Sequence, residues 1–129
     1  MAKKATAKAA GATKRDMLEW AKRDSVQFVQ LQFTDLNGLL KGVTIPVSKL
    51  EGALEDGLWF DGSSIEGFTR IFESDMYLKL DMNTYSVIPW TKNSGTVAAR
   101  FMCDVYMPDG KPFEGDPRYI LKRDRKSVV

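Results

Sequence analysis

The chain has 129 residues, no histidine and a single cysteine, with 43% hydrophobic and 11% aromatic residues. This composition predicts one folded domain and excludes a disordered protein, a disulfide-built scaffold, and zinc binding or catalysis through histidine. The net charge of +2 conceals basic ends, +5 over residues 1–15 and +4 over 118–129, around an acidic stretch of net −7 over 16–117; this pattern argues against a nucleic-acid-binding domain.

The cellular setting follows from what the sequence lacks. No apolar run approaches the ~20 residues that a spanning helix needs. The N-terminus has no apolar core of a secretory signal. Together with the lone Cys103, these features indicate a cytoplasmic protein with no membrane partner. Residues 1–15, rich in alanine and lysine, predict a basic tail that is disordered or a frayed helix. It is either a solubilising extension, an electrostatic contact with nucleic acid or an acidic surface, or a transit peptide.

Two short helices are predicted in the first half of the chain. Asp16 is a suitable N-cap for the first, in which apolar residues recur at helical spacing. Ser48 and Glu51 have the spacing of a capping box and predict a second helix, which Gly57 ends.

Strands are predicted wherever apolar and polar residues alternate. Residues 29–33 alternate, and the Asn37-Gly38 pair behind them predicts a hairpin with a return strand over 39–45. Further strands are predicted over residues 76–80, 85–90 and 97–105.

Two residues of the strand over 97–105 have assignable environments. Cys103 falls on the inward face, which predicts a buried and inert thiol. Arg100 falls on the outward face, where either a cross-strand ion pair or a ligand is open to it.

A last helix is predicted to start at Asp116-Pro117, with the cap followed by proline at the first helical position. Its pattern continues to Arg123, and the six residues that follow do not extend it. The order of elements predicts the α+β class, with one mixed sheet and a helix packed on one face.

Residues 57–75 match neither the helical nor the strand period, and they hold aromatic residues among glycines and acids. Loops of this length inside a compact domain are uncommon and usually functional. The run Asp61-Gly62-Ser63-Ser64 places a carboxylate beside two hydroxyls. A carboxylate in such a group can bind a cation, deprotonate a bound amine or cap a turn, and the chemistry alone leaves these alternatives open.

Four motifs, in order along the chain, resemble the N-terminal domain of glutamine synthetase. They are the segments 35–42, 59–68, 73–76 and 116–123. The resemblance implies a β-grasp domain over residues 16–115. It also implies that residues 116–129 begin a linking helix to a catalytic domain that this chain lacks, with an end that departs from the family.

The resemblance implies an activity for the whole enzyme. The family joins ammonia to glutamate: ATP phosphorylates the side-chain carboxylate, and ammonia then displaces phosphate. The catalytic domain holds ATP and Mg²⁺ or Mn²⁺, so we expect no cofactor or metal site in this chain and no activity from it alone.

The resemblance also implies site residues. Subunits of the family form rings, and each active site lies between one subunit's catalytic domain and the N-terminal domain of its neighbour. By this match Asp61 binds ammonium and takes its proton, and Ser64 lines the ammonium pocket. Arg70 either belongs to a feedback site for glutamine or pairs with Glu66 or Glu73.

Other interpretations stay open. The chain is either the N-terminal domain of a synthetase, a standalone β-grasp module that docks on and regulates a full-length synthetase, or an interaction protein without a link to glutamine. Trp59 either packs at a subunit contact or stacks on a nucleotide. Exposed apolar surface at Trp59, Phe60 and Phe68 predicts self-association of the domain on its own.

Overall fold

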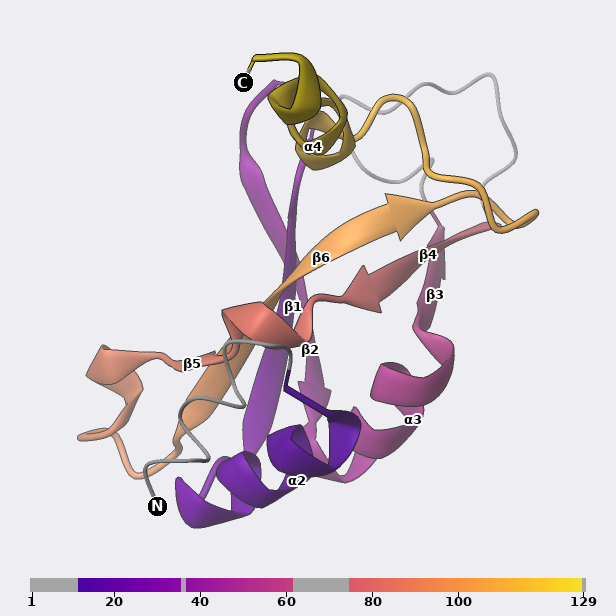
Figure 1. The fold of residues 1–129 in the computed structure, drawn as a ribbon. Helices are drawn as coiled ribbons and strands as arrows, with labels where there is room; N and C mark the ends of the chain where they lie inside the picture. Colours follow the sequence, from indigo (N-terminus) through magenta and orange to yellow (C-terminus); the bar gives the residue numbers. More distant parts are fainter. Residues whose placement is uncertain (1–11, 36, 62–74, 129) are drawn as a thin grey trace.

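A computed structural model describes residues 12–35, 37–61 and 75–128, and within them the chain forms one curled mixed sheet (Figure 1). The strands run in the order β2-β1-β6-β4-β3, and β5 pairs with β6. Their bounds are β1 Phe28–Thr34, β2 Leu40–Pro46, β3 Leu58–Asp61, β4 Asp75–Leu80, β5 Ser86–Val87 and β6 Ala98–Tyr106. The central pair, β1 and β6, is parallel, and the other pairs are antiparallel.

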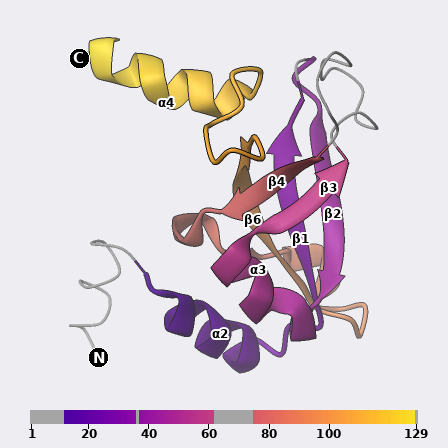
Figure 2. The same ribbon diagram turned by 90° about the vertical axis from the view of Figure 1, so that its right-hand side faces the viewer.

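Three α-helices accompany the sheet in the part of the chain that is described: α2 Lys14–Arg23, α3 Leu50–Asp56 and α4 Pro117–Val128. The described residues also form the 3₁₀ turns η1 Val47–Lys49, η3 Met82–Thr84 and η4 Pro89–Thr91; η1 leads from β2 into α3, and η3 and η4 flank β5. Helices α2 and α3 lie together on one face, and α4 lies at the opposite end of the molecule (Figure 2). The predicted α+β class is confirmed, with α2 and α3 both covering the face. Among the described helices, none combines the length and apolar character of a membrane-crossing segment.

The hydrophobic core lies between the sheet and the helices α2 and α3, which cover one of its faces. Leu31 of β1 and Phe101 of β6 are fully buried, as are Met17 of α2 and Leu50 of α3. Burying such a side chain stabilises the fold by about 1.5–3 kcal/mol. The alternation in β1 and β6 that predicted an inward face is confirmed.

The predicted hairpin is confirmed at the turn between β1 and β2. Gly38 has φ +83°, a left-handed conformation that glycine adopts without strain. The turn is closed by Asp35, whose backbone N–H donates to the Leu39 carbonyl at 3.0 Å. The Asp35 Oδ1 atom accepts the N–H groups of Asn37 and Leu39, each at 2.9 Å.

The start of α2 differs from the prediction. Thr13, not Asp16, is the N-cap: its Oγ1 accepts the Asp16 N–H at 3.2 Å, and Asp16 Oδ2 accepts the Thr13 N–H at 3.0 Å. The two side chains thus form a reciprocal capping box. The helix therefore begins inside the stretch 1–15 that the sequence predicts as a tail, and Ala12 is already buried.

The predicted Ser48–Glu51 capping box is wrong. The chain passes through η1 first, and α3 begins at Leu50 with no side-chain cap. The backbone N–H of Leu50 donates to the Val47 carbonyl, so the 3₁₀ turn supplies the partner that a cap would have given.

Two further boundaries are corrected. The strand predicted over 85–90 is only Ser86–Val87, because Pro89 opens the turn η4. The predicted break after Arg123 is also wrong, since α4 continues to Val128. Its last residues are mostly polar but include good helix formers, and a polar face leaves no apolar period to detect.

Candidate functional site

Asp61 is the last residue of β3, which ends the strand order at one edge of the sheet. Its backbone pairs with Asp75 of the antiparallel strand β4. Its side chain lies outside the described residues, and so do Ser64 and Arg70. The roles predicted for these three residues therefore stay predictions.

The position of Asp61 depends on a glycine at the start of its strand. Gly57 follows α3 with φ +75°. A Cβ atom there would lie 2.7 Å from the Leu78 carbonyl oxygen and 2.9 Å from Cδ2 of Tyr77. Only glycine permits both the backbone conformation and this close approach to β4. The chain can therefore turn directly from α3 into β3.

Residues 58–61 are a strand within the segment predicted to have no regular structure. Trp59 points outward and is 55% exposed, as expected. Phe60 instead points inward, and its ring lies 5.3 Å from that of Phe33, so the prediction that it is exposed is wrong. The Trp59 ring lies 5.1 Å from Tyr77, which in turn stacks on Tyr106 at 5.4 Å, forming an aromatic row across three strands. Phe68 lies outside the described residues.

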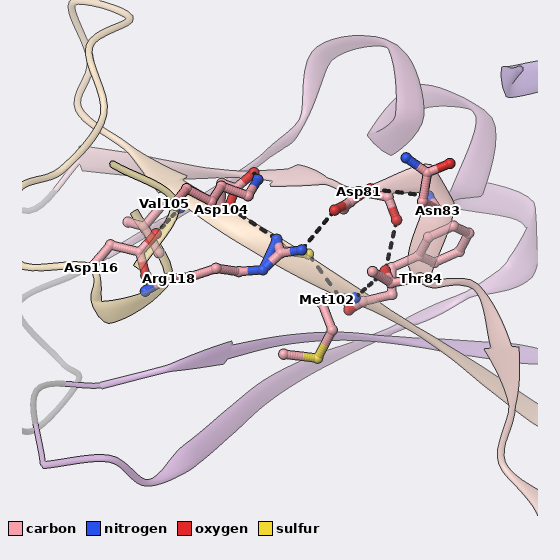
Figure 3. Close-up of polar contacts among 11 residues, drawn as sticks. Asp81, Asn83, Thr84, Met102, Asp104, Val105, Asp116 and Arg118 are labelled. Carbon is pink, nitrogen blue, oxygen red and sulfur yellow. Dashed lines mark hydrogen bonds and ion pairs between the residues drawn. The ribbon is translucent and has the colours of Figure 1, made fainter. Parts of the chain in front are cut away.

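A cluster of charged side chains joins α4 to the sheet (Figure 3). Arg118 donates through Nη2 to Asp81 Oδ2 at 2.6 Å and through Nη1 to Asp104 Oδ1 at 3.0 Å. Lys122 Nζ donates to the other Asp104 oxygen at 3.0 Å. The side chains of Arg118, Asp81 and Asp104 are each only about one-fifth exposed, so solvent screens these pairs less than it screens surface pairs. We call these four residues the α4 clasp.

Asp116 completes the junction and confirms the predicted cap of α4. Its buried carboxylate accepts the Arg118 N–H at 3.1 Å through Oδ1 and the Val105 N–H of β6 at 3.0 Å through Oδ2. Burial raises the pKa of Asp116, although the two N–H groups act in the opposite direction. One side chain thus caps the helix and ties it to the sheet.

The electrostatics of the clasp favour a charged Asp81 carboxylate. Burial acts to raise the pKa of Asp81, but the hydrogen bonds from Arg118 and from the Asn83 N–H outweigh it and the pKa is lowered. Burial likewise acts to lower the pKa of Arg118, and Asp81 and Asp104 reverse this effect. Thr84 holds η3 in place, because its hydroxyl donates to the Asp81 carbonyl at 2.7 Å and accepts the Met102 N–H at 2.8 Å.

Cys103 and Arg100 have different outcomes. Cys103 is fully buried, which confirms the predicted inward position, and burial raises the pKa of its thiol; its inertness stays a prediction. Arg100 is half-buried beside a groove of about 320 Å³ that Gln30 and Trp90 also line. Among the described residues no carboxylate pairs with Arg100, so the cross-strand ion pair is not formed there.

Sequence reasoning missed the clasp and the buried state of Asp35. The clasp brings together residues that are far apart in the sequence: Asp81, Asp104 and Arg118. The Asp116-Pro117 pair predicted the start of α4, but no sequence pattern predicted that the helix is tied to Asp81 and Asp104. Asp35 Oδ2 is buried without a hydrogen bond, and Lys41 Nζ lies 3.8 Å from it.

The architecture defines the class of the protein. A mixed sheet with a central parallel pair, a hairpin at one edge and helices on one face is a β-grasp domain. The family described as "Glutamine synthetase, beta-Grasp domain" matches residues 25–108, and the chain belongs to that family. The predicted resemblance to the N-terminal β-grasp domain of glutamine synthetase is thereby confirmed.

Several proteins similar to this chain are named glutamine synthetase. A glutamine synthetase of Staphylococcus aureus strain Mu50 is 53% identical over 116 residues, which are 90% of this chain and 26% of that protein. One from Methanosarcina mazei is 56% identical over 110 residues, 85% of this chain and 24% of that protein. The cryo-EM structure of Plasmodium falciparum glutamine synthetase matches 91% of this chain and 22% of its own, with a TM-score of 0.78 and 27% identity. The chain thus spans about a quarter of the length of its curated relatives.

Proposed function

We propose that this chain is the part of a glutamine synthetase that contributes the ammonium-site loop to the active site of a neighbouring subunit. The whole enzyme would ligate ammonia to glutamate at the expense of ATP, and the chain alone would be inactive. The observation that carries the proposal is the position of Asp61 at the end of an edge strand. Strand β3 is an edge of the described sheet, and a second subunit can approach at such an edge.

The chemistry assigned to Asp61 is proton transfer. Ammonium carries no lone pair, so it must lose a proton before nitrogen can attack the γ-glutamyl phosphate. A carboxylate beside the bound cation stabilises it by Coulomb attraction and then accepts that proton. The Ser64 hydroxyl would accept one of the ammonium N–H groups, and Arg70 would contact glutamine as a feedback inhibitor.

ATP and Mg²⁺ or Mn²⁺ belong to this proposal only through the rest of the enzyme. Within residues 12–35, 37–61 and 75–128 no group of three or more acidic or cysteine side chains could hold a metal ion.

The proposed partners are other synthetase subunits in a cytoplasmic ring homo-oligomer. The exposed Trp59 on edge strand β3 supports a protein contact near Asp61. The same feature would serve a standalone module docking on a full-length synthetase. An excess of this chain added to a full-length relative separates the two functions, since a regulator would change that enzyme's activity or ring size.

The test of Asp61 uses a chimera in which this chain replaces the matching quarter of the Staphylococcus aureus enzyme. Once the chimera is active, Asp61→Asn is expected to lower kcat at saturating ammonium by about 10²–10⁴-fold, because the general base is lost while its shape is kept. The control is Asp56→Asn, an exposed carboxylate at the end of α3. Unchanged turnover of the D61N chimera at saturating ammonium would rule out the proposed role.

A further inference from the structure

Helix α4 is held to the body by polar contacts. No α4 side chain that the structure describes belongs to the hydrophobic core. Tyr119 and Ile120 are only half-buried, and Leu121 is 67% exposed. Figure 2 shows the helix projecting from the sheet, with its far end away from the other elements. Because apolar packing fixes so little of α4, the clasp and the Asp116 cap must set its direction.

The contacts of the clasp are divided between two elements of the body. Asp81 immediately precedes η3, and Asp104 lies on β6, on the face opposite Cys103. Arg118 reaches one carboxylate with each of its two Nη atoms. A planar guanidinium held at both ends has little freedom to rotate, whereas contact with a single carboxylate would leave the helix free to swing about it.

We propose that Arg118 is a positioning residue that fixes the direction in which α4 leaves the sheet, by joining the helix to Asp81 and Asp104 at once. Asp116 attaches the first turn of α4 to β6. One attachment alone would leave the helix free to pivot, and Arg118 supplies the second attachment that fixes its direction. Lys122 strengthens the attachment to Asp104 one turn later. The inference concerns the geometry of this chain and stands apart from the ligase activity proposed above.

The proposal has a consequence for Asp61, which rests on the proposed function. Asp104 lies opposite Lys79 on β4, and β4 pairs with β3, which ends at Asp61. The clasp thus connects α4 through three hydrogen-bonded strands to the edge that carries Asp61. In a longer synthetase, Arg118 would set the placement of Asp61 relative to the protein beyond α4.

The test measures the direction of α4 in this chain by electron spin resonance. Spin labels are placed at Thr44→Cys on β2 and Arg125→Cys on α4, both exposed positions. Cys103 stays unlabelled because it is buried. The parent chain is expected to give one narrow distance distribution. Both Arg118→Met and Arg118→Lys are expected to give a broad or displaced distance distribution instead of the narrow one. The lysine variant keeps the charge but cannot bridge both carboxylates.

The matched control is Arg123→Met, because the contacts of Arg123 are with Asp124 and the Tyr119 ring on the same helix. It should keep the narrow distribution. Hydrogen exchange of the β1 and β6 amides checks that the sheet stays folded. A narrow, undisplaced distribution in R118K would overturn the proposal, as would unfolding of the sheet in R118K, which would make Arg118 a residue of general stability. If the sheet unfolds in R118M but not in R118K, the distance distribution of R118K decides whether the proposal holds.

Discussion

At the scale of single residues, Gly57 shows how one absent side chain fixes a local structure. Its positive φ and its approach to the Leu78 carbonyl leave no room for a Cβ atom. The sequence predicted Gly57 as a helix terminator, which is confirmed. The closeness of β4, which makes the glycine necessary, depends on strand pairing that no local pattern reveals.

Gly57→Ala is expected to lower the free energy of unfolding by about 2 kcal/mol or more, from backbone strain together with the contact to Leu78. Urea denaturation measures the change. Gly52→Ala is the matched control, because Gly52 lies in α3 with nothing within 4 Å of its added Cβ. The control should stabilise the protein by about 0.5–1 kcal/mol. Equal free energies of unfolding for Gly57→Ala and Gly52→Ala would contradict the argument that residue 57 must be glycine.

The caps show why residue-level predictions succeed unevenly. The Thr13 and Asp16 pair had the spacing of a capping box, but their position in a low-complexity stretch concealed it. Ser48 and Glu51 had the same spacing without forming one, because Pro46 ends β2 and the backbone of η1 already satisfies the helix start. A motif therefore predicts a cap only when the chain conformation before it is known.

At the scale of elements, the junction of α4 with the sheet should respond to acid. The lowered pKa of Asp81 means that its stabilising contribution is complete above its ordinary value of 3.8 and is lost as the pH falls through the folded-state pKa. Asp116, with a raised pKa, has the opposite sign: its contribution is present below 3.8 and is lost as the pH rises through its folded-state pKa.

Comparison with Asp81→Asn isolates the first effect, because Asp116 is common to both proteins. At pH 7 the variant is expected to be less stable by about 1–2 kcal/mol, since the charge-assisted bond to Arg118 is gone. The difference should begin to shrink below about pH 4 and disappear only below the lowered folded-state pKa, where protonated Asp81 and asparagine are alike. Thermal unfolding across pH 3–7 measures it, and a difference that is constant with pH would contradict the assignment.

Strands were predicted best where one face is fully buried. In β1 and β6 the alternation is long and its inward residues lie at the centre of the sheet. Strand β3 was missed because it has only four residues and follows the helix directly. The clasp could not be predicted, because its carboxylates and its arginine meet only after β6 and α4 have formed.

At the scale of the whole molecule, Cys103 reports on the integrity of the sheet. It lies at the centre of β6, buried with a raised thiol pKa. Its alkylation by iodoacetamide should therefore be about 10³-fold or more slower in native buffer than in urea, because the thiol reacts only from the open state. Mass spectrometry follows the reaction, and Thr44→Cys supplies an exposed thiol as reference. Rapid alkylation of Cys103 in a chain with native circular dichroism would show that β6 opens locally.

The parallel pairing of β1 with β6 has a consequence for how the protein is made. Residue 28 pairs with residue 98, so the centre of the sheet joins the beginning of the domain to a segment synthesised near its end. Non-local pairing of this kind slows folding, because a long loop must close before the contacts repay its entropy. On the ribosome the β1–β2 hairpin can form early. Until β6 has left the exit tunnel, the apolar face of the hairpin lacks the strand that pairs with β1, and such exposed surface is prone to aggregate.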